Sequence, residues 1–308
     1  MLIKSADSRD GDLETLRGLL ERPDVEGDKK REIEREIRTL QSGLKGEREA
    51  AYEIDFHYGP SKNWAVIHDL RIEHAGRVAQ IDHLLINRVL ELYVCESKRF
   101  SAGIAINELG ECSAFFNGKQ VGVPSPFEQN RKHIEVLAHM CSDGIVALPK
   151  RLGVSMKPQF KSLVLVSKNA RITRPKKEVA GLNDILKVDQ IKTRIDRAMD
   201  TDTSVLAIAK LIGSDTLQEF AATLAAQHKP ITFAWHARFG LPKDAPATSL
   251  STHPENHPNG GEPEKAKLVC SACGAAVSYS VAKFCWFNKP RFGGKVFCMT
   301  CQRNIPAV

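Results

Sequence analysis

Two short polar motifs contain the residue types that could do chemistry in this sequence. They read QIDH at residues 80–83 and CESK at residues 95–98. Each stands within or at the end of an apolar run that alternates as a β-strand does, so we expect the two runs to pair as an antiparallel hairpin about a turn at 87–90. In such a hairpin the carboxylates of Asp82 and Glu96 lie opposite or nearly so, about 5 Å apart. Like charges so placed repel each other unless a cation lies between them.

Lys98 belongs to the same predicted group. Residues two apart on a strand project from one face, so Glu96 and Lys98 share a face, while Cys95 and Ser97 point to the other. A divalent cation held by oxygens of Asp82 and Glu96 could polarise a phosphate. Lys98 could then orient or deprotonate a water, or stabilise the developing charge. The alternative is a cross-strand salt bridge at the surface, because so loose a pattern also arises by accident.

A second chemical pattern lies near the C-terminus, where five of the eight cysteines fall within residues 270–301. Each CxxC turn directs two thiolates at one point, so two such turns form a closed tetrahedral site for Zn²⁺. A structural zinc is favoured over redox dithiols, because a module of about forty residues has too little apolar core to fold without such a staple. Cys285 is expected to be a buried small side chain rather than a ligand. The four predicted zinc ligands are Cys270, Cys273, Cys298 and Cys301.

The net charge of +7 is concentrated in this same module. Residues 265–308 contain seven basic and no acidic residues, and the residues before them are balanced in charge. A local positive charge with aromatic residues interleaved favours contact with a nucleic acid through phosphate pairing and base stacking. Several of these aromatics must also form the module's own core, and zinc ribbons bind proteins as well as nucleic acids, so a protein partner stays open.

The remaining pattern predicts the elements that position these groups. Apolar residues keep helical spacing over residues 12–57, interrupted by Pro23 and Gly27, which predicts a helical hairpin that packs on the body or on a second copy. The body after it alternates β-type runs with helical ones, so the fold class is α/β with a sheet flanked by helices. Strands are expected at 64–73, 78–88, 89–98, 101–106, 111–121 and 161–167, and helices at 125–144, 189–199, 203–212 and 215–227.

Residues 241–263 contain five prolines and few large apolar residues, which is typical of a linker. No run of eighteen apolar residues occurs, and the N-terminus lacks the basic-then-apolar order of a secretory signal. The sequence therefore predicts a cytoplasmic location and no membrane partner.

The ordered set of motifs resembles the nuclease-related domain called NERD, a family grouped with the PD-(D/E)XK nuclease superfamily. The set comprises Gly46-Glu47 opening a helix, the two motifs at 80–83 and 95–98 on consecutive strands, and Pro126, Gln129 and His133 on a following helix. The resemblance covers roughly residues 44–170. It implies a central mixed sheet with flanking helices, as in restriction endonucleases, and a phosphodiesterase site that depends on Mg²⁺ or Mn²⁺.

The resemblance also implies a role for each matching residue. It makes Asp82 and Glu96 the metal ligands, Lys98 the catalytic lysine, Glu47 a carboxylate lining the site, and Gln80 and Gln129 polar neighbours. Two alternative roles stay open: Glu47 could serve only the helix dipole, and Gln129 could hold a strand carbonyl. His83 and His133 are expected beside the site rather than on the metal, since Mg²⁺ prefers oxygen. The turn at 87–89 lacks the glycine common in such domains, so its type and the register are undecided.

The cysteine-rich tail resembles the tails of some NERD proteins and zinc ribbons in general. We therefore expect a helical hairpin at 1–43, a NERD-like body with a helical C-terminal part at 44–238, a linker at 239–264 and a zinc ribbon at 265–308. The predicted function is a metal-dependent nuclease, acting on DNA in preference to RNA, whose ribbon holds the nucleic acid near the site. Homodimerisation through the N-terminal helices is left open. The rival hypothesis is a scaffold that binds nucleic acid or protein without cutting, although it would not require Asp82, Glu96 and Lys98.

Overall fold

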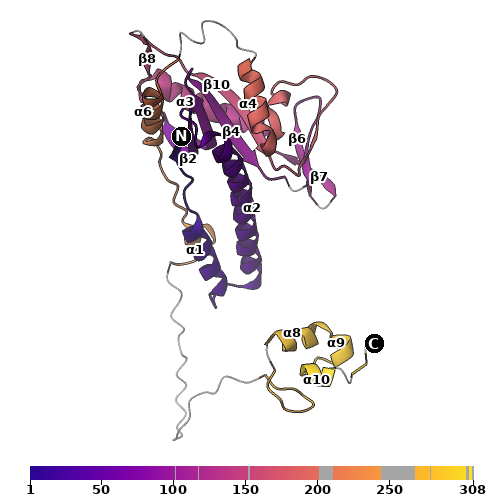
Figure 1. Ribbon diagram of the computed structural model, residues 1–308. Coiled ribbons are helices and arrows are strands. Elements are labelled where there is room, and N and C mark those ends of the chain that lie inside the picture. Colours follow the sequence, from indigo (N-terminus) through magenta and orange to yellow (C-terminus); the bar gives the residue numbers. More distant parts are fainter. Residues whose placement is uncertain are drawn as a thin grey trace, which may run out of the picture. The chain divides into compact units, whose positions relative to one another are not determined.

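The computed structural model describes residues 1–100, 102–116, 118–151, 153–200, 211–243, 268–277, 279–302 and 305–306. The chain divides into two compact units, Met1–Ala247 and Thr248–Val308, which are described one at a time (Figure 1). Most of the predicted linker falls outside the described residues, and so does most of the helix predicted at 203–212.

The first unit contains a six-stranded mixed sheet, which confirms the predicted α/β class. Its centre is the predicted meander, in which β2, β3 and β4 pair antiparallel. On one side β10 runs parallel to β4 and β12 parallel to β10, and on the other side β1 runs parallel to β2. In sheet order the strands are β1 (Leu2–Lys4), β2 (Trp64–His74), β3 (Arg77–Asn87), β4 (Glu91–Lys98), β10 (Gln159–Val166) and β12 (Ile185–Lys187).

Two smaller sheets complete the strands of this unit. The larger one contains the strands expected at 101–106 and 111–121, and its apolar side chains pack with those of β10 and β12. Its order is β11 (Arg171–Thr173), β5 (Gly103–Ile106), β6 (Cys112–Phe116) and β7 (Lys119–Val123), and the other sheet pairs β8 (Lys150–Arg151) with β9 (Val154–Ser155).

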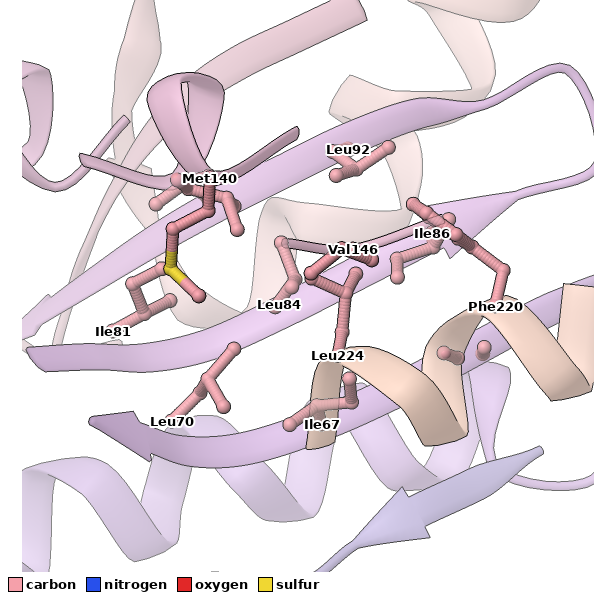
Figure 2. Packing of buried hydrophobic residues seen from close by; sticks show 14 of the residues in the cluster. Ile67, Leu70, Ile81, Leu84, Ile86, Leu92, Met140, Val146, Phe220 and Leu224 are labelled. Atoms are coloured by element: carbon pink, nitrogen blue, oxygen red, sulfur yellow. The ribbon is translucent and has the colours of Figure 1, made fainter. Parts of the chain in front are cut away.

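Helices cover both faces of the central sheet. On one face α3 (Pro126–Ser142) and α6 (Ser214–Ala225) bury Met140, Phe220 and Leu224 against β2, β3 and β4 (Figure 2). On the other face α2 (Gly27–Tyr58) and α4 (Ile191–Asp200) pack against the same strands and β10. Two 3₁₀ turns, η1 (Leu182–Asp184) and η2 (Val188–Gln190), flank β12. The side chain of Ser125 accepts a hydrogen bond from the Glu128 N–H, which caps α3 where the sequence predicts it to begin.

The predicted N-terminal hairpin consists of α1 (Asp10–Glu21) and the first half of α2. Its apolar side chains, among them Leu16 and Ile33, pack on Trp235 at the start of α7 (Trp235–Arg238) and on Phe239. The hairpin thus covers apolar residues of its own unit. One expectation is wrong: Gly46-Glu47 does not open a helix but lies within α2, which runs without a break from Gly27 to Tyr58. The helix continues because both halves bury an apolar face, one in the hairpin and one on the sheet.

The second unit is built from short elements around the cysteines. Its described part holds α8 (Tyr279–Phe287), α9 (Lys289–Phe292), α10 (Met299–Gln302) and one antiparallel bridge between Val269 and Ala276. Its buried apolar cluster is small, with Cys270, Val277 and Ala282 at the centre. No helix among the described residues of the chain combines the length and the apolar character that crossing a bilayer would require.

Candidate active site and candidate metal centre

The register of the β3–β4 hairpin brings the two predicted motifs together. His83 pairs with Cys95 and Leu84 with Val94, so the same register places Asp82 opposite Glu96. The turn forms without a glycine: Leu90 adopts a left-handed φ of 59°, and the Asn87 side chain oxygen accepts hydrogen bonds from the N–H groups of Val89 (3.1 Å) and Glu91 (2.9 Å).

A local irregularity in the sheet gives Asp82 its position. Ile67 and Leu70 are three residues apart on β2, and Ile81 and Leu84 are three apart on β3, yet all four pack in one cluster (Figure 2). Regular alternation would send residues three apart to opposite faces. The alternation of side chains between the two faces of the sheet is therefore interrupted at Asp69 in β2 and at Asp82 in β3. Asp69 adopts a left-handed φ of 53° at this point. The carboxylates stand where the regular sheet is interrupted.

Glu96 and Lys98 share a face as predicted. The Lys98 Nζ lies 2.6 Å from the Glu96 Oε1, and the glutamate side chain is only 2% exposed. The other carboxylate oxygen, Oε2, is buried without a hydrogen-bond partner, and the His133 Nδ1 lies 3.5 Å from it. Burial raises the pKa of Glu96, whereas Lys98 above all, and to a smaller degree Gln129, lower it. Gln129 and His133 therefore both lie near Glu96.

The middle of α2 brings Glu47 to the same place. Gly46 allows this approach, because a Cβ there would stand 3.0 Å from the Cβ of Arg99, just beyond the end of β4. Glu47, Asp69, Gln80 and Asp82 line one cavity of about 410 Å³ between α2, the sheet and residues 231–235. Gln80 donates a hydrogen bond to the Asp69 Oδ1. Glu96 and Lys98 do not line this cavity.

The electrostatics of the group favour a cation. Burial, and then the charges of Glu96 and Glu47, raise the pKa of Asp82 well above its ordinary value, although the Ser97 N–H donates to its Oδ2 at 2.7 Å. Burial, followed by Asp69, also raises the pKa of Glu47. A buried carboxylate oxygen without a partner is unfavourable, so Glu96 Oε2 fits a hard divalent ion.

The spacing of the three carboxylates limits how they could hold such an ion. Among the described residues, only the four cysteines form a group of three or more potential ligands with donor atoms all within 4.8 Å of one another. Glu47, Asp82 and Glu96 are therefore more widely spread. This suits Mg²⁺, which is commonly bound by one or two carboxylates and completed by water.

A chain of hydrogen bonds runs from α2 across β2 and β3 to β4 beside the carboxylates. The sequence did not reveal it. Asp55 Oδ1 lies 3.0 Å from His68 Nε2, His68 Nδ1 lies 2.7 Å from His83 Nδ1, and His83 Nε2 lies 2.8 Å from Ser97 Oγ. Burial, and then the neighbouring His68, hold the pKa of His83 well below its ordinary value, so this ring is neutral. No spacing in the sequence marks Asp55 and His68, because they meet only through the packing of α2 on β2.

The role of holding a strand carbonyl, which we considered for Gln129, belongs to its neighbour Asn130. The fully buried Asn130 donates from Nδ2 to the Val94 carbonyl at 2.8 Å and to the Ser162 Oγ at 2.9 Å, which ties β4 to β10. His133 lies one helical turn further on α3. Burial, and then the charge of Lys98, lower its pKa to about 4.

The second unit brings its two CxxC pairs together as predicted. The Sγ atoms of Cys270, Cys273, Cys298 and Cys301 all lie within 4.8 Å of one another, so the cluster can hold a metal ion and is compatible with a zinc ribbon. Backbone hydrogen bonds, first of all at Cys298, lower the pKa of Cys270 to about 6. Hydrogen bonds with neighbouring cysteines, first Cys298, raise the pKa of Cys301 to about 12. Four thiolates cannot all be charged at this spacing without a cation.

Cys285 stands outside the cluster, as expected. It is buried, and its Sγ accepts hydrogen bonds from the Phe297 N–H at 3.3 Å and from the Gln302 side chain at 3.2 Å.

Comparison with known proteins gives one family for part of the chain. No curated protein and no solved structure matches it. The family model of NERD, the nuclease-related domain, matches residues 42–167. The matched range begins inside α2 and ends just after β10, so it includes Glu47, both strand motifs and Gln129. Residues 42–167 therefore form a nuclease-related (NERD) domain, as the order of the motifs predicts.

Proposed function

We propose that the first unit is a metal-dependent nuclease that hydrolyses phosphodiester bonds, of DNA in preference to RNA. The observation that carries this proposal is the buried Glu96 Oε2, which has no hydrogen-bond partner while its sister oxygen contacts Lys98 at 2.6 Å. The NERD match supports a nuclease-related function for the same residues. A carboxylate with one unpartnered oxygen is suited to bind a cation that in turn binds the phosphate of the substrate.

Each side chain then has a role that follows from its position. Asp82 and Glu96 would hold Mg²⁺ or Mn²⁺, which supplies Lewis acidity to a phosphate oxygen and lowers the pKa of bound water. Lys98 places a positive charge beside Glu96, where it stabilises negative charge that develops on the phosphate. Gln129 lies near Glu96 as a polar neighbour, and Gln80 holds Asp69 at the cavity wall by a hydrogen bond. Glu47 completes the acidic side of the cavity.

For the second unit we propose a structural zinc held by the four clustered cysteines. The cations of residues 265–308 would hold nucleic acid near the nuclease, with residues 239–264 as the tether. This division, with 1–43 as the hairpin and 44–238 as the nuclease body, remains a proposal. So do the cytoplasmic location and a homodimer through α1 and α2.

The experiment is a cleavage assay on the full chain with labelled single- and double-stranded DNA and RNA. Mg²⁺ or Mn²⁺ should permit cleavage, and EDTA should stop it. Lys98→Ala should lower the rate by about 100-fold or more, because it removes a charge that acts in the transition state. Lys119→Ala, which alters an exposed lysine on β7, is the matched control.

The fold of each variant is checked by its thermal midpoint, and Lys98→Gln serves as a second variant that can still donate a hydrogen bond to Glu96. Undiminished cleavage in both Lys98 variants would exclude this lysine from the mechanism. If the parent binds nucleic acid but cleaves none with either metal, the scaffold hypothesis replaces the nuclease.

A further inference from the structure

The outer face of α2 carries two exposed aromatic side chains beside the candidate site. Tyr52 and Phe56 are one helical turn apart, and each is 67% exposed. Their ring centroids are 6.4 Å apart with an interplanar angle of 30°. The opposite face of the helix buries Ala50 and Ile54 against the sheet, so the two rings contribute nothing to the core. A stacked aromatic pair left in water is a sign of a binding surface.

Two positive charges precede this pair on α2. Lys45 and Arg48 are exposed and precede Tyr52 by seven and four residues, so they lie on the same outer face of α2. We call these four residues, Lys45, Arg48, Tyr52 and Phe56, the aromatic stripe.

Two further exposed cations approach from other elements. Arg99 meets α2 beside Gly46 and donates to the Ser42 Oγ at 3.1 Å. Lys168 follows β10, and its backbone N–H donates to the Glu49 Oε1 at 3.4 Å. Acidic side chains of α2 also lie near the pair: Glu49 accepts from the Lys168 N–H, Asp55 pairs with His68, and Glu53 stands three residues before Phe56. The most exposed charges beside the aromatic pair are the cations Lys45, Arg48, Arg99 and Lys168, which can pair with the phosphates of a polyanion.

The aromatic stripe is continuous with the candidate active site. Arg48 and Ala51 line the cavity that also contains Glu47 and Asp82. A nucleic-acid strand bound along α2 would therefore reach the carboxylates that line that cavity. This continuity favours the substrate over a protein as the occupant.

We propose that the aromatic stripe binds an unpaired, single-stranded segment of the nucleic-acid substrate and directs it to the cavity. Bases stack on Tyr52 and Phe56, and phosphates pair with Lys45 and Arg48. Single strands are selected because the faces of their bases are free, whereas in a duplex those faces are stacked on one another. The inference rests on the proposed nuclease function and narrows its substrate class.

The test measures binding by fluorescence anisotropy of a labelled single-stranded DNA and of the duplex with the same sequence. It uses the full chain without added Mg²⁺ and without chelator, so that nothing is cleaved and the cysteine cluster keeps its ion. The double variant Tyr52→Ala/Phe56→Ala should weaken single-strand binding by about tenfold or more and change duplex binding little. Phe116→Ala is the matched control, since this phenylalanine is 52% exposed on β6. It should bind as the parent does.

A second variant tests the charges of the aromatic stripe. Lys45→Gln/Arg48→Gln should reduce the slope of log affinity against log salt for single strands by about 1.4, which is about 0.7 for each phosphate that is no longer neutralised. Circular dichroism and thermal midpoints of both double variants check that α2 remains folded.

The outcomes separate this inference from the proposed function. Single-strand binding that both double variants leave unchanged would overturn it. So would a change in oligomeric state by light scattering in place of a change in binding, because the aromatic stripe would then be an interface between copies. A parent that binds single strands through these residues but cleaves nothing with Mg²⁺ would uphold the aromatic stripe and refute the nuclease.

Discussion

The carboxylate group of the first unit and the cysteine cluster of the second both favour a cation, but they relate to their folds in opposite ways. Asp82 and Glu96 stand on a six-stranded sheet whose two faces are buried under helices. The cysteines sit in a unit whose buried cluster centres on Cys270, Val277 and Ala282. In the first unit the fold holds the carboxylates in place, whereas the small core of the second unit leaves its stability dependent on the cysteine cluster.

The largest expected effect is the loss of the second unit when one cysteine is changed. Cys273→Ser should abolish the bound zinc and the folding of residues 268–302, because structural zinc contributes on the order of 10 kcal/mol in such small modules. The thermal midpoint of the first unit should not change. Metal analysis and NMR of the full chain measure both results, with Cys285→Ala as the control that keeps its zinc. A full zinc equivalent in Cys273→Ser would refute the ligand assignment.

A smaller effect should follow from removing the second unit altogether. A chain ending before Lys265 should keep the melting behaviour of the first unit, because that unit has its own core. Its affinity for DNA should fall, and the slope of log affinity against log salt should drop by about one for each phosphate that the removed cations had neutralised. Measuring the DNA affinity of the full and the truncated chain at several salt concentrations tests this prediction. An unchanged slope would assign the second unit to a protein partner.

The smallest effect concerns the stability of the carboxylate group without metal. Because burial and repulsion raise the pKa of Asp82 in the folded protein, its ionisation there destabilises the fold. This destabilisation is absent below the unfolded pKa, grows as the pH rises from the unfolded to the folded pKa, and is constant above the folded pKa. Asp82→Asn removes it and still offers an oxygen to the Ser97 N–H.

At pH 8 without added Mg²⁺, Asp82→Asn should therefore be more stable than the parent by about 1 kcal/mol, as for other opposed like charges in sheets. The difference should shrink as the pH falls, and adding Mg²⁺ should stabilise only the parent. Urea unfolding at several pH values measures this. A variant that is less stable than the parent at pH 8 would show that Asp82 is a structural residue.

The sequence predicts the local part of this fold well. The strands around Asp82 and Glu96 alternate clearly, and Ser125 before Pro126 marks the start of α3, so periodicity and capping predict both correctly. The cysteine cluster also follows from spacing alone, because CxxC turns impose their own geometry. These features depend on residues that are close in the sequence or joined by one turn.

What the sequence did not reveal depends on contacts between distant residues. The parallel pairing of β4 with β10 joins Glu96 to Val164, and no local pattern specifies it. The helix start expected at Gly46 is wrong because a glycine that permits close approach looks the same in sequence as one that ends a helix. Asp69 also escapes notice, since a single aspartate in a strand does not reveal that both strands reverse their faces there.

The paired histidines bear on which cations the carboxylate group could bind. Both ring nitrogens of His68 and both of His83 are engaged, by Asp55, by each other and by Ser97. An imidazole binds zinc through a ring nitrogen lone pair, so these two rings are withdrawn from competition. Beside Asp82 this pair therefore offers no ring nitrogen to a cation, whereas the cysteine cluster offers sulfur alone. A zinc ion would therefore find no free ring nitrogen on these two histidines, whereas His133 keeps one, its Nδ1 lying without a hydrogen-bond partner 3.5 Å from the Glu96 Oε2.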